Sequence, residues 1–363
     1  MTIQVLEAAQ AMARLDTFGA VIDARSPSEY AEDHLPGAVN WPVLDDDERR
    51  RIGTEYKQIS PFDAQKRGAA LVARNIARHI EAHVMDRPKS WHPLVYCWRG
   101  GKRSGALAWF LDQMGFRTHV LEGGYKAYRT AVIVALQTLP ERLDFEVVCG
   151  KTGSGKTRLL GALRDAGAQV LDLEGLARHR GSVLGILPDC PQPSQKAFDT
   201  ALWNALRGFD PARPVFVESE SKKVGNVRVA EALIQRMRAH GACLHVEMPD
   251  AGRLALLLED YDFLARDVEL FCRQLEGLVA LRGRATVDAW QAQARSGRIA
   301  EVFLALMHSH YDPGYLKSMR NNFSGFARAR RVPISDGGPD TLRGVAAALL
   351  HGTRSAASSS DLR

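Results

Sequence analysis

The sequence predicts an α/β protein with two domains, each organised around a parallel sheet. Short apolar strands alternate with segments of helical periodicity, two strands lead through glycine-rich turns into helices, and 363 residues is the length of about two domains. We place the first domain at residues 1–136 and the second at residues 141–352, with a helical C-terminal part. Residues 353–363 are small and polar, so we expect a disordered tail.

The composition restricts the functional classes. A hydrophobic content of 45% and a charged content of 25% are ordinary for a globular protein. No apolar run is long enough to cross a bilayer and the N-terminus lacks signal-peptide features, so we expect a cytoplasmic protein without a membrane partner. The five cysteines include no C-x-x-C pair, which argues against a zinc site or a disulfide framework. The net charge of +6 is compatible with an acidic partner such as nucleic acid.

A phosphate-binding loop lies at the start of the second domain. An apolar strand at residues 145–150 runs into the pattern G-x-x-x-x-G-K-[ST], and a helix follows from Lys156. Amides of such a turn converge on an anion, the lysine adds a cation, and the Thr157 hydroxyl can hold Mg²⁺. We expect no covalently bound cofactor. The predicted phosphate-binding residues are Gly150, Lys151, Thr152, Gly153, Ser154, Gly155, Lys156 and Thr157.

Charged residues follow two further predicted strands of this domain, at residues 169–172 and 214–218. The carboxyl ends of parallel strands meet at one edge of a sheet, so these residues are expected beside the phosphate-binding loop. An acid at such a strand end usually orients Mg²⁺ or its water, although a solvated helix start explains part of the pattern. The candidate supporting residues are Asp172, Glu174, Arg178, His179, Arg180, Glu218 and Glu220.

The C-terminal part of the second domain reads as helical from Arg253 to Met307. Its apolar stripe at residues 254, 257, 258 and 261 is interpreted as core. The segment 308–315 is expected to break the helix, and its histidines are interpreted as solvated loop residues. Residues 332–335 are expected to form a last strand.

A second strand–loop–helix lies in the first domain and carries a thiol. A strand at residues 94–97 ends on Cys97, and a helix is predicted from Gly105 to Met114. Loop amides, a helix N-terminus and three cations favour a thiolate, which can attack sulfur, selenium or phosphorus. The alternative is a buried structural cysteine. The candidate catalytic residues are Cys97, Arg99, Gly100, Gly101, Lys102 and Arg103.

The first domain resembles the rhodanese family. The resemblance rests on residues 23–30 (DARSPSEY), 34–40 (HLPGAVN), the loop 97–103 and the turn Gly123-Gly124. It implies a rhodanese-like fold in which Cys97 would carry a persulfide or perselenide. Cys97 and Arg103 also satisfy C-x5-R, the spacing of cysteine-dependent phosphatases, in most of which His stands where this chain has Tyr96.

Both halves together resemble the tRNA 2-selenouridine synthase family, over nearly the whole chain. The resemblance implies a rhodanese-like domain followed by a P-loop NTPase-like domain. It also implies replacement of sulfur by selenium in wobble-position 2-thiouridine of tRNA, using selenophosphate, with an S-geranyl intermediate made from geranyl diphosphate. Whether Cys97 forms a perselenide or assists a selenophosphorylated base stays open. The segments that carry the resemblance are 97–104, 150–157, 172–181, 192–195, 218–221 with Gly225, and 310–315.

Contact with tRNA would use arginines of the C-terminal part, because guanidinium groups suit phosphates and stacked bases. The cluster Arg328, Arg330 and Arg331 is the preferred candidate. The remaining candidates are Arg282, Arg284, Arg295, Arg298 and Arg320. Three other functions stay open: a C-x5-R phosphatase with a regulatory P-loop domain, an ATP-driven kinase or sulfurtransferase, and a non-catalytic tRNA-binding module.

Overall fold

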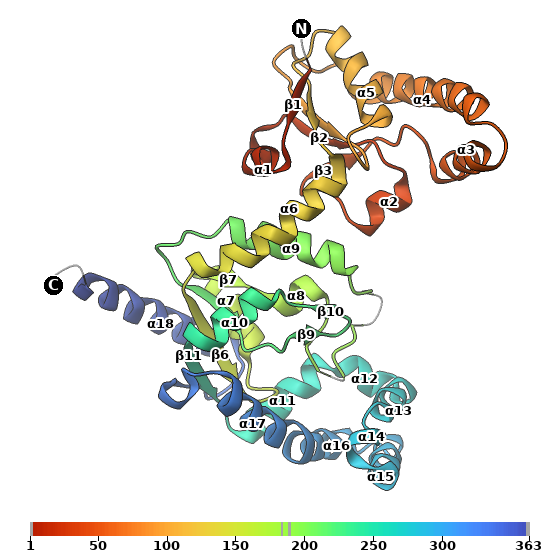
Figure 1. Cartoon of the computed structure of the whole chain (residues 1–363). Coiled ribbons are helices and arrows are strands. Elements are labelled where there is room, and N and C mark those ends of the chain that lie inside the picture. Colours follow the sequence, from red (N-terminus) through yellow and green to blue (C-terminus); the bar gives the residue numbers. More distant parts are fainter. Residues whose placement is uncertain (1–2, 183, 188–189, 361–363) are drawn as a thin grey trace. The chain divides into compact units, whose positions relative to one another are not determined.

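A computed structural model of the chain describes residues 3–182, 184–187 and 190–360, with side chains as far as residue 351 (Figure 1). The chain divides into two compact units. The first comprises Met1–Leu136 and Pro193–Asn204, and the second comprises Gln137–Gln192 and Ala205–Arg363. No helix in the described ranges is long and apolar enough to cross a membrane.

The first unit is built on a five-stranded parallel sheet of order β1-β5-β4-β2-β3. Its strands are β1 (Gln4–Leu6), β2 (Ala20–Asp23), β3 (Ala38–Asn40), β4 (Pro93–Tyr96) and β5 (His119–Leu121). Its helices are α1 (Ala8–Ala13), α2 (Pro27–Glu32), α3 (Asp46–Gln58), α4 (Pro61–His83), α5 (Lys102–Gln113), α6 (Gly124–Thr138) and most of α9 (Gln195–Arg207). The short 3₁₀ turn η1 (Leu15–Thr17) follows α1.

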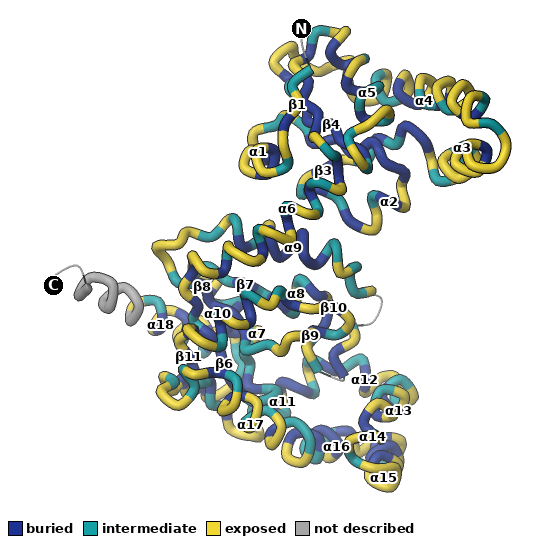
Figure 2. Tube along the Cα trace, in the orientation of Figure 1, coloured by how far each residue is buried: buried dark blue, intermediate teal, exposed yellow. Residues whose placement is uncertain are grey.

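The centre of this sheet is buried because β4 lies between β5 and β2 and all four of its residues are inaccessible. Figure 2 shows buried backbone along these strands and exposed positions on the outer helices. Local signals set the helix starts. The Ser26 and Glu29 side chains form a capping box at α2, and Asp45 with Glu48 does so at α3. The charged residues that follow Asp45 therefore form a full helix, α3.

The helix α9 joins the first unit, although the sequence division assigns all of residues 141–352 to the second domain. The Thr200 hydroxyl donates to Asp33 at 3.0 Å, and the Tyr125 hydroxyl donates to the same carboxylate at 2.7 Å. Trp203 packs edge-on against Tyr128, with 5.8 Å between the ring centroids. Buried polar partners and aromatic packing both hold this helix, and neither is visible in local sequence.

The second unit has a five-stranded parallel sheet of order β12-β11-β6-β8-β7. Its strands are β6 (Phe145–Gly150), β7 (Gln169–Leu171), β8 (Val215–Glu218), β11 (Ala242–Glu247) and β12 (Arg330–Pro333), and the hairpin β9 (Lys223–Val224) and β10 (Val227–Arg228) is separate. Its helices include α7 (Lys156–Asp165), α8 (Leu173–Ala177), α10 (Glu231–His240), α11 (Asp250–Asp260), α12 (Asp262–Arg266), α13 (Val268–Glu276), α14 (Val279–Arg282) and α15 (Arg284–Arg295). The last helical elements are α16 (Ile299–Ala305), η3 (Leu306–Tyr311), α17 (Asp312–Asn322), η4 (Phe326–Arg328) and α18 (Pro339–Ser360), and η2 (Leu139–Arg142) precedes β6.

Two apolar clusters support the second unit. One joins β6, β11 and β12 to α7 and α18, and the other fills the helical part between β11 and β12. Leu257 and Tyr261 are buried in the second cluster, with Leu254 and Leu258 packed against it. This confirms the interpretation of that stripe as core.

Two expectations for the C-terminal part differ from the structure. The segment 308–315 does not break the helix: α16 continues through the π-helical η3 into α17. Pro313, which cannot donate a backbone hydrogen bond, comes directly after this π-helical turn. The backbone of α18 also runs on to Ser360, whereas disorder is expected from residue 353, and residues 361–363 lie outside the described range. Alanine, the strongest helix former, recurs along this stretch.

Candidate active site

The Cys97 loop joins β4 to α5 in the first unit. The thiol is buried, at 3% exposed, and the Ser104 hydroxyl donates to its sulfur at 3.1 Å. Burial alone would raise the pKa of Cys97. Hydrogen bonds from the Ser104 hydroxyl and amide, the charge of Arg103 and the Arg99 amide outweigh burial, so the pKa of Cys97 lies below its ordinary value. The loop is therefore arranged to stabilise a thiolate.

The turn at Gly123-Gly124 supports this loop from beneath. The amides of Tyr125 and Lys126 donate to the carbonyls of Cys97 and Trp98, at 2.8 and 3.0 Å. Gly124 has a φ of +58°, and a Cβ there would lie 2.3 Å from the Cys97 carbonyl oxygen. Only glycine allows the start of α6 to approach the loop this closely.

A buried ion pair lies in the same unit. Arg25 donates to both carboxylate oxygens of Asp23 and to the Asp33 carbonyl, and its guanidinium stacks 4.0 Å from the centroid of the Tyr125 ring. Arg25 and Asp23 are both inaccessible. Together they fix Tyr125, whose amide holds the Cys97 carbonyl.

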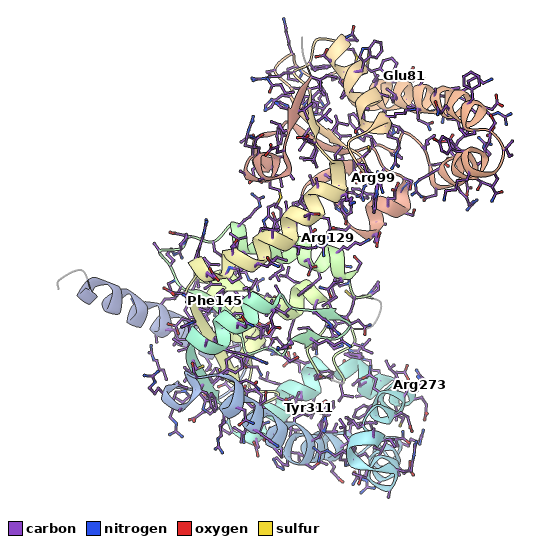
Figure 3. The ribbon with its side chains drawn as sticks, in the orientation of Figure 1. Glu81, Arg99, Arg129, Phe145, Arg273 and Tyr311 are labelled. Carbon is purple, nitrogen blue, oxygen red and sulfur yellow. The ribbon has the colours of Figure 1, made fainter. Side chains whose placement is uncertain are left out.

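The cations of the loop differ in their surroundings. Arg103 donates to Glu29 at 2.9 Å, whereas Arg99 and Lys102 are exposed (Arg99 is labelled in Figure 3). Burial opposes ionisation of Glu29, but hydrogen bonding and charge from Arg103 lower its pKa. Gly101 caps α5. The Tyr96 hydroxyl accepts from the Leu35 amide at 3.2 Å, so it does not replace the histidine of a phosphatase loop.

The phosphate-binding loop joins β6 to α7 in the second unit. Gly153 and Gly155 adopt φ values of +79° and +80°, and a Cβ on Gly153 would lie 2.9 Å from the Arg253 carbonyl. Lys156 Nζ donates to the carbonyls of Gly150 and Lys151, at 2.8 and 3.3 Å. Burial lowers the pKa of Lys156, although nearby acids oppose this. The loop has the backbone geometry that the sequence pattern predicts.

Three glutamates gather beside Lys156 and Thr157. The Thr157 hydroxyl donates to Glu174 at 3.1 Å, and the Glu174 amide donates to Glu218 at 2.9 Å. Burial, followed by the charge of Glu220, raises the pKa of Glu174 to about 7. Burial, followed by the charge of Glu174, raises the pKa of Glu218 well above its ordinary range, and burial raises the pKa of Glu220. These carboxyl groups are crowded and poorly solvated.

The same glutamates are candidate ligands for a metal ion. The described residues contain no group of three or more His, Cys, Asp or Glu able to hold a metal ion. Mg²⁺ at a phosphate site needs fewer protein ligands, because phosphate oxygens and water complete its octahedron. The Thr157 hydroxyl and the Glu174 carboxylate are suitable oxygen donors, and the buried Glu218 Oε2 has no hydrogen-bond partner in the described part of the chain. The residues present therefore fit Mg²⁺.

A cavity of about 470 Å³ opens beside the phosphate-binding loop. Its polar end is lined by residues 152–158 together with Glu174, Arg180, Ser219 and Glu220. The lining also includes the apolar and aromatic side chains of Leu257, Tyr261, Tyr311, Tyr315, Met319 and Phe323, and the polar residues Ser182, Ser221, Asp260, His310 and Ser318. Anion-binding groups and apolar side chains therefore line one space.

Tyr315 is a site residue that the sequence analysis missed. Its hydroxyl accepts from the Gly150 amide at 2.6 Å, and its ring lies 5.7 Å from Lys156 Nζ. The signal was present, since Tyr315 belongs to a segment that carries the family resemblance, but a helix break was expected there. Tyr311, labelled in Figure 3, also lines the cavity.

The other predicted supporting residues lie in different settings. Asp172 caps α8 by accepting from the Gly175 amide at 2.7 Å, and Arg178 is exposed at the end of that helix. His179 is buried and accepts from the Gly181 amide at 3.1 Å, so it stabilises its own turn. Arg180 lines the cavity and stacks on Tyr261.

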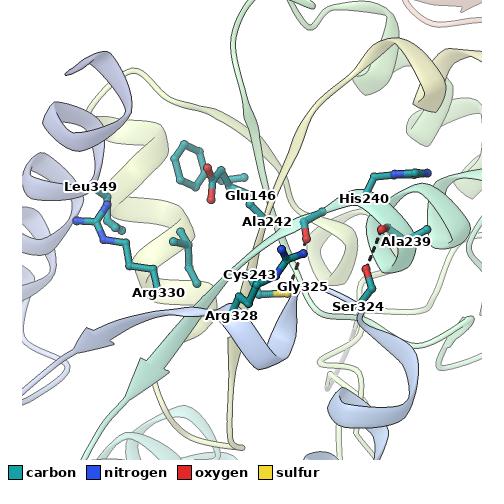
Figure 4. A pocket seen from close by; sticks show the side chains of 13 residues that line it. Glu146, Ala239, His240, Ala242, Cys243, Ser324, Gly325, Arg328, Arg330 and Leu349 are labelled. Carbon is teal, nitrogen blue, oxygen red and sulfur yellow. Dashed lines mark hydrogen bonds between the residues drawn. The ribbon is translucent and has the colours of Figure 1, made fainter. Parts of the chain in front are cut away.

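The arginine cluster expected to bind tRNA is divided by the pleat of β12. Arg331 pairs with Glu247 at 3.0 Å, whereas Arg328 and Arg330 line a cavity of about 420 Å³ with Glu146 and Leu349 (Figure 4). Neighbouring residues of a strand point to opposite faces, so Arg330 and Arg331 diverge. Of the other candidates, Arg282 bonds His310, Arg284 pairs with Glu276, Arg295 with Glu269 and Arg298 with Glu301, while Arg320 is exposed.

Family models match both halves of the chain. Residues 6–131 match the rhodanese-like domain, and residues 143–286 match the tRNA 2-selenouridine synthase AAA domain. Among solved structures, a rhodanese-related protein from Thermoplasma volcanium aligns with 35% of this chain and 92% of its own at 18% identity, with a TM-score of 0.22.

Curated relatives named tRNA 2-selenouridine synthase extend the match. One from Nitrosomonas europaea is 37% identical over 66% of this chain and 63% of its own, so this alignment spans just under two thirds of that relative. One from Marinobacter nauticus is 35% identical over 69% of each chain. One from Bdellovibrio bacteriovorus is 30% identical over 82% of this chain and 88% of its own. The chain belongs to the tRNA 2-selenouridine synthase family.

Proposed function

We propose that this chain is a tRNA-modifying transferase that replaces sulfur by selenium in wobble-position 2-thiouridine. Selenophosphate supplies the selenium, and the S-geranyl base, made from geranyl diphosphate, is the intermediate. The names of the relatives support the tRNA substrate and the selenation. The observation that carries the geranyl step is the cavity beside Lys156, whose lining combines the anion-binding loop with apolar and aromatic side chains.

The ligand of that cavity must combine a strong anion with an apolar body. The loop amides, the N-terminus of α7 and Lys156 suit a diphosphate. The Leu257, Tyr311, Met319 and Phe323 side chains give an isoprenoid chain an apolar surface that a nucleotide would not need. Geranyl diphosphate has both parts.

In the first step, the sulfur of the 2-thiouracil attacks C1 of the geranyl group. The S–C bond forms as the C–O bond to diphosphate breaks, and the proton on N3 of the base is released to solvent. Lys156 and the loop amides stabilise the charge that develops on the departing diphosphate. Thr157 and Glu174 would hold a Mg²⁺ ion, which would neutralise part of that charge.

In the second step, the selenium of selenophosphate adds to C2 of the base and the geranylthiolate leaves. Water then breaks the Se–P bond, releasing phosphate. We assign this step to the Cys97 loop, because its amides and the Arg99, Lys102 and Arg103 side chains suit an anionic selenium donor. A lowered pKa keeps Cys97 as a thiolate, the form that can accept a proton from the water that breaks the Se–P bond.

Mass spectrometry of thiolated tRNA incubated with the protein tests the proposal. Geranyl diphosphate alone should add a geranyl group to the base, and subsequent selenophosphate should replace the alkylated sulfur by selenium. If neither product forms and tRNA stimulates ATP hydrolysis, the protein is instead an ATP-driven enzyme. Turnover of an aryl phosphate that requires Cys97 would establish a phosphatase.

A further inference from the structure

A second cavity lies on the other side of the phosphate-binding loop. It measures about 710 Å³ and is formed by the carboxyl ends of β11 and β12, the first turn of α18 and the loop residues Lys151 and Ser154. In open parallel sheets, ligands bind outside the carboxyl ends of the strands, where the strand order reverses. The order β12-β11-β6-β8-β7 reverses direction at β6, so this cavity occupies a binding position.

Ser154 connects this space with the cavity beside Lys156, because it lines both. Ser154 is 1% exposed, and its hydroxyl has no hydrogen-bond partner among the residues that the structure describes. A buried hydroxyl without a partner costs free energy unless a ligand satisfies it. The two cavities therefore share a lining residue whose hydroxyl is itself enclosed by the protein.

We propose that the cavity at the ends of β11 and β12 is the subsite for the acceptor base, a pyrimidine nucleotide extruded from the RNA. This inference rests on the proposed function, since it supplies the second reactant of the alkylation. Because the two cavities share Ser154 as a lining residue, an acceptor held here would lie next to a donor bound beside Lys156.

The lining suits a planar heterocycle. Val246, Met248 and Ile334 form an apolar floor that continues into the core of the unit. Glu247 can accept from the N3–H of a thiouracil. The Ser335 and Thr341 hydroxyls both donate to Asp336, at 2.8 and 3.1 Å, so they present acceptor oxygens to the cavity. Lys151, His245 and Arg253 also line the cavity, so its apolar floor is combined with several polar and charged groups.

The charges at the rim favour RNA over a free nucleotide. Arg331 pairs with the cavity residue Glu247 at 3.0 Å and is 78% exposed, and the lining residue Lys151 pairs with Asp312 at 3.2 Å and is 39% exposed. These cations can contact the phosphates on either side of an extruded nucleotide. A nucleoside triphosphate would instead place its phosphates in the loop that the donor diphosphate occupies.

Photocrosslinking locates the base without depending on turnover. An anticodon stem-loop with photoreactive 4-thiouridine at the wobble position should crosslink to residues 247–249 or 333–335. The same label one nucleotide away is the control and should not mark these peptides. Crosslinks confined to residues 180–182, 219–221 or 310–319 would place the base beside Lys156 and overturn the inference.

A blocking variant provides the second test. Ser335 is exposed at the cavity, so Ser335→Trp should obstruct it without disturbing the core, and Ala348→Trp on exposed α18 surface is the matched control. Ser335→Trp should reduce the wobble crosslink and the alkylation rate at least about tenfold and leave geranyl diphosphate binding, measured by calorimetry, unchanged. Loss of binding of a fluorescent ATP analogue with an unchanged crosslink would make the cavity a nucleotide subsite and overturn the inference. If the wild-type protein does not alkylate RNA, the proposed function fails while the crosslink still reports on this subsite.

Discussion

The Cys97 loop and the phosphate-binding loop are alike in backbone and opposite in electrostatics. Each follows a buried strand, contains glycine at positive φ and leads into a helix. The first surrounds an ionisable group of the protein and lowers the pKa of the Cys97 thiol. In the second, burial lowers the pKa of Lys156 and raises the pKa values of Glu174, Glu218 and Glu220.

The difference shows that a strand–loop–helix cradle does not by itself fix its chemistry. The first loop uses its donors to stabilise an anion that the protein makes. The second uses its backbone and a lysine to receive an anion from outside, and it carries acids that suit a cation accompanying that anion. Neighbouring side chains decide which of the two roles a cradle serves.

Removing the reactive group of one loop at a time should have the largest effect, because each variant should slow only one of the two reaction steps. Cys97→Ser should reduce selenation of pre-alkylated tRNA at least about a thousandfold, because the thiolate is lost, and leave alkylation within about twofold. Lys156→Ala should slow alkylation about a hundredfold, because a cation on the leaving diphosphate is lost, and leave selenation of pre-alkylated tRNA unchanged. Single-turnover mass spectrometry measures both steps. Normal selenation by Cys97→Ser would refute the role of that loop.

The support beneath the Cys97 loop should be the next most sensitive feature. Gly124→Ala places a methyl group 2.3 Å from the Cys97 carbonyl oxygen, so it should lower the free energy of unfolding by about 2–4 kcal/mol. Gly37→Ala is the matched control: its φ is +72° but no atom lies within 4 Å of the added carbon, so only about 1 kcal/mol is expected. Chemical denaturation measures both, and equal losses would show that backbone φ alone matters.

The buried Glu218 carboxyl beside the second loop should make the free energy of unfolding depend on pH. The folded-state pKa of Glu218 is raised, so its contribution is fully present below about pH 4.5 and is lost as pH rises through the folded-state value. Glu218→Gln cannot ionise and keeps an acceptor for the Glu174 amide. Relative to wild type, the variant should gain about 1–2 kcal/mol between pH 5 and pH 8 in denaturation experiments. The exposed Glu141→Gln is the control, and a parallel shift in both variants would contradict the burial of the Glu218 charge.

The smallest effect concerns the thiol itself. Ser104→Ala removes a hydrogen bond to the Cys97 sulfur, so the pKa of Cys97 should rise. Iodoacetamide labelling of Cys97 near pH 7, followed by peptide mass spectrometry, should slow about threefold. Ser104→Thr retains the hydroxyl and should label at close to the wild-type rate. Faster labelling in Ser104→Ala would show that access, rather than thiolate formation, controls the reaction.

The sequence was sufficient for the parts of the molecule that depend on local chemistry. The spacing of Gly150, Gly155 and Lys156 specifies a loop, and the matching φ angles follow from it. The sequence did not show that Arg330 and Arg331 point to opposite faces of a strand, because β12 begins at Arg330, two residues before the expected start. Tyr315 could not be placed because a π-helical turn keeps η3 and α17 continuous through Pro313.

The packing of α9 in the first unit means that the polypeptide passes between the units three times, after residues 136, 192 and 204. A fragment ending at Leu136 would therefore lose part of its own interior, leaving the buried Asp33 carboxylate without its Thr200 partner and Tyr128 without Trp203. Studies that express the two halves separately would sever this connection. Inactive fragments would then report damaged folding rather than shared catalysis.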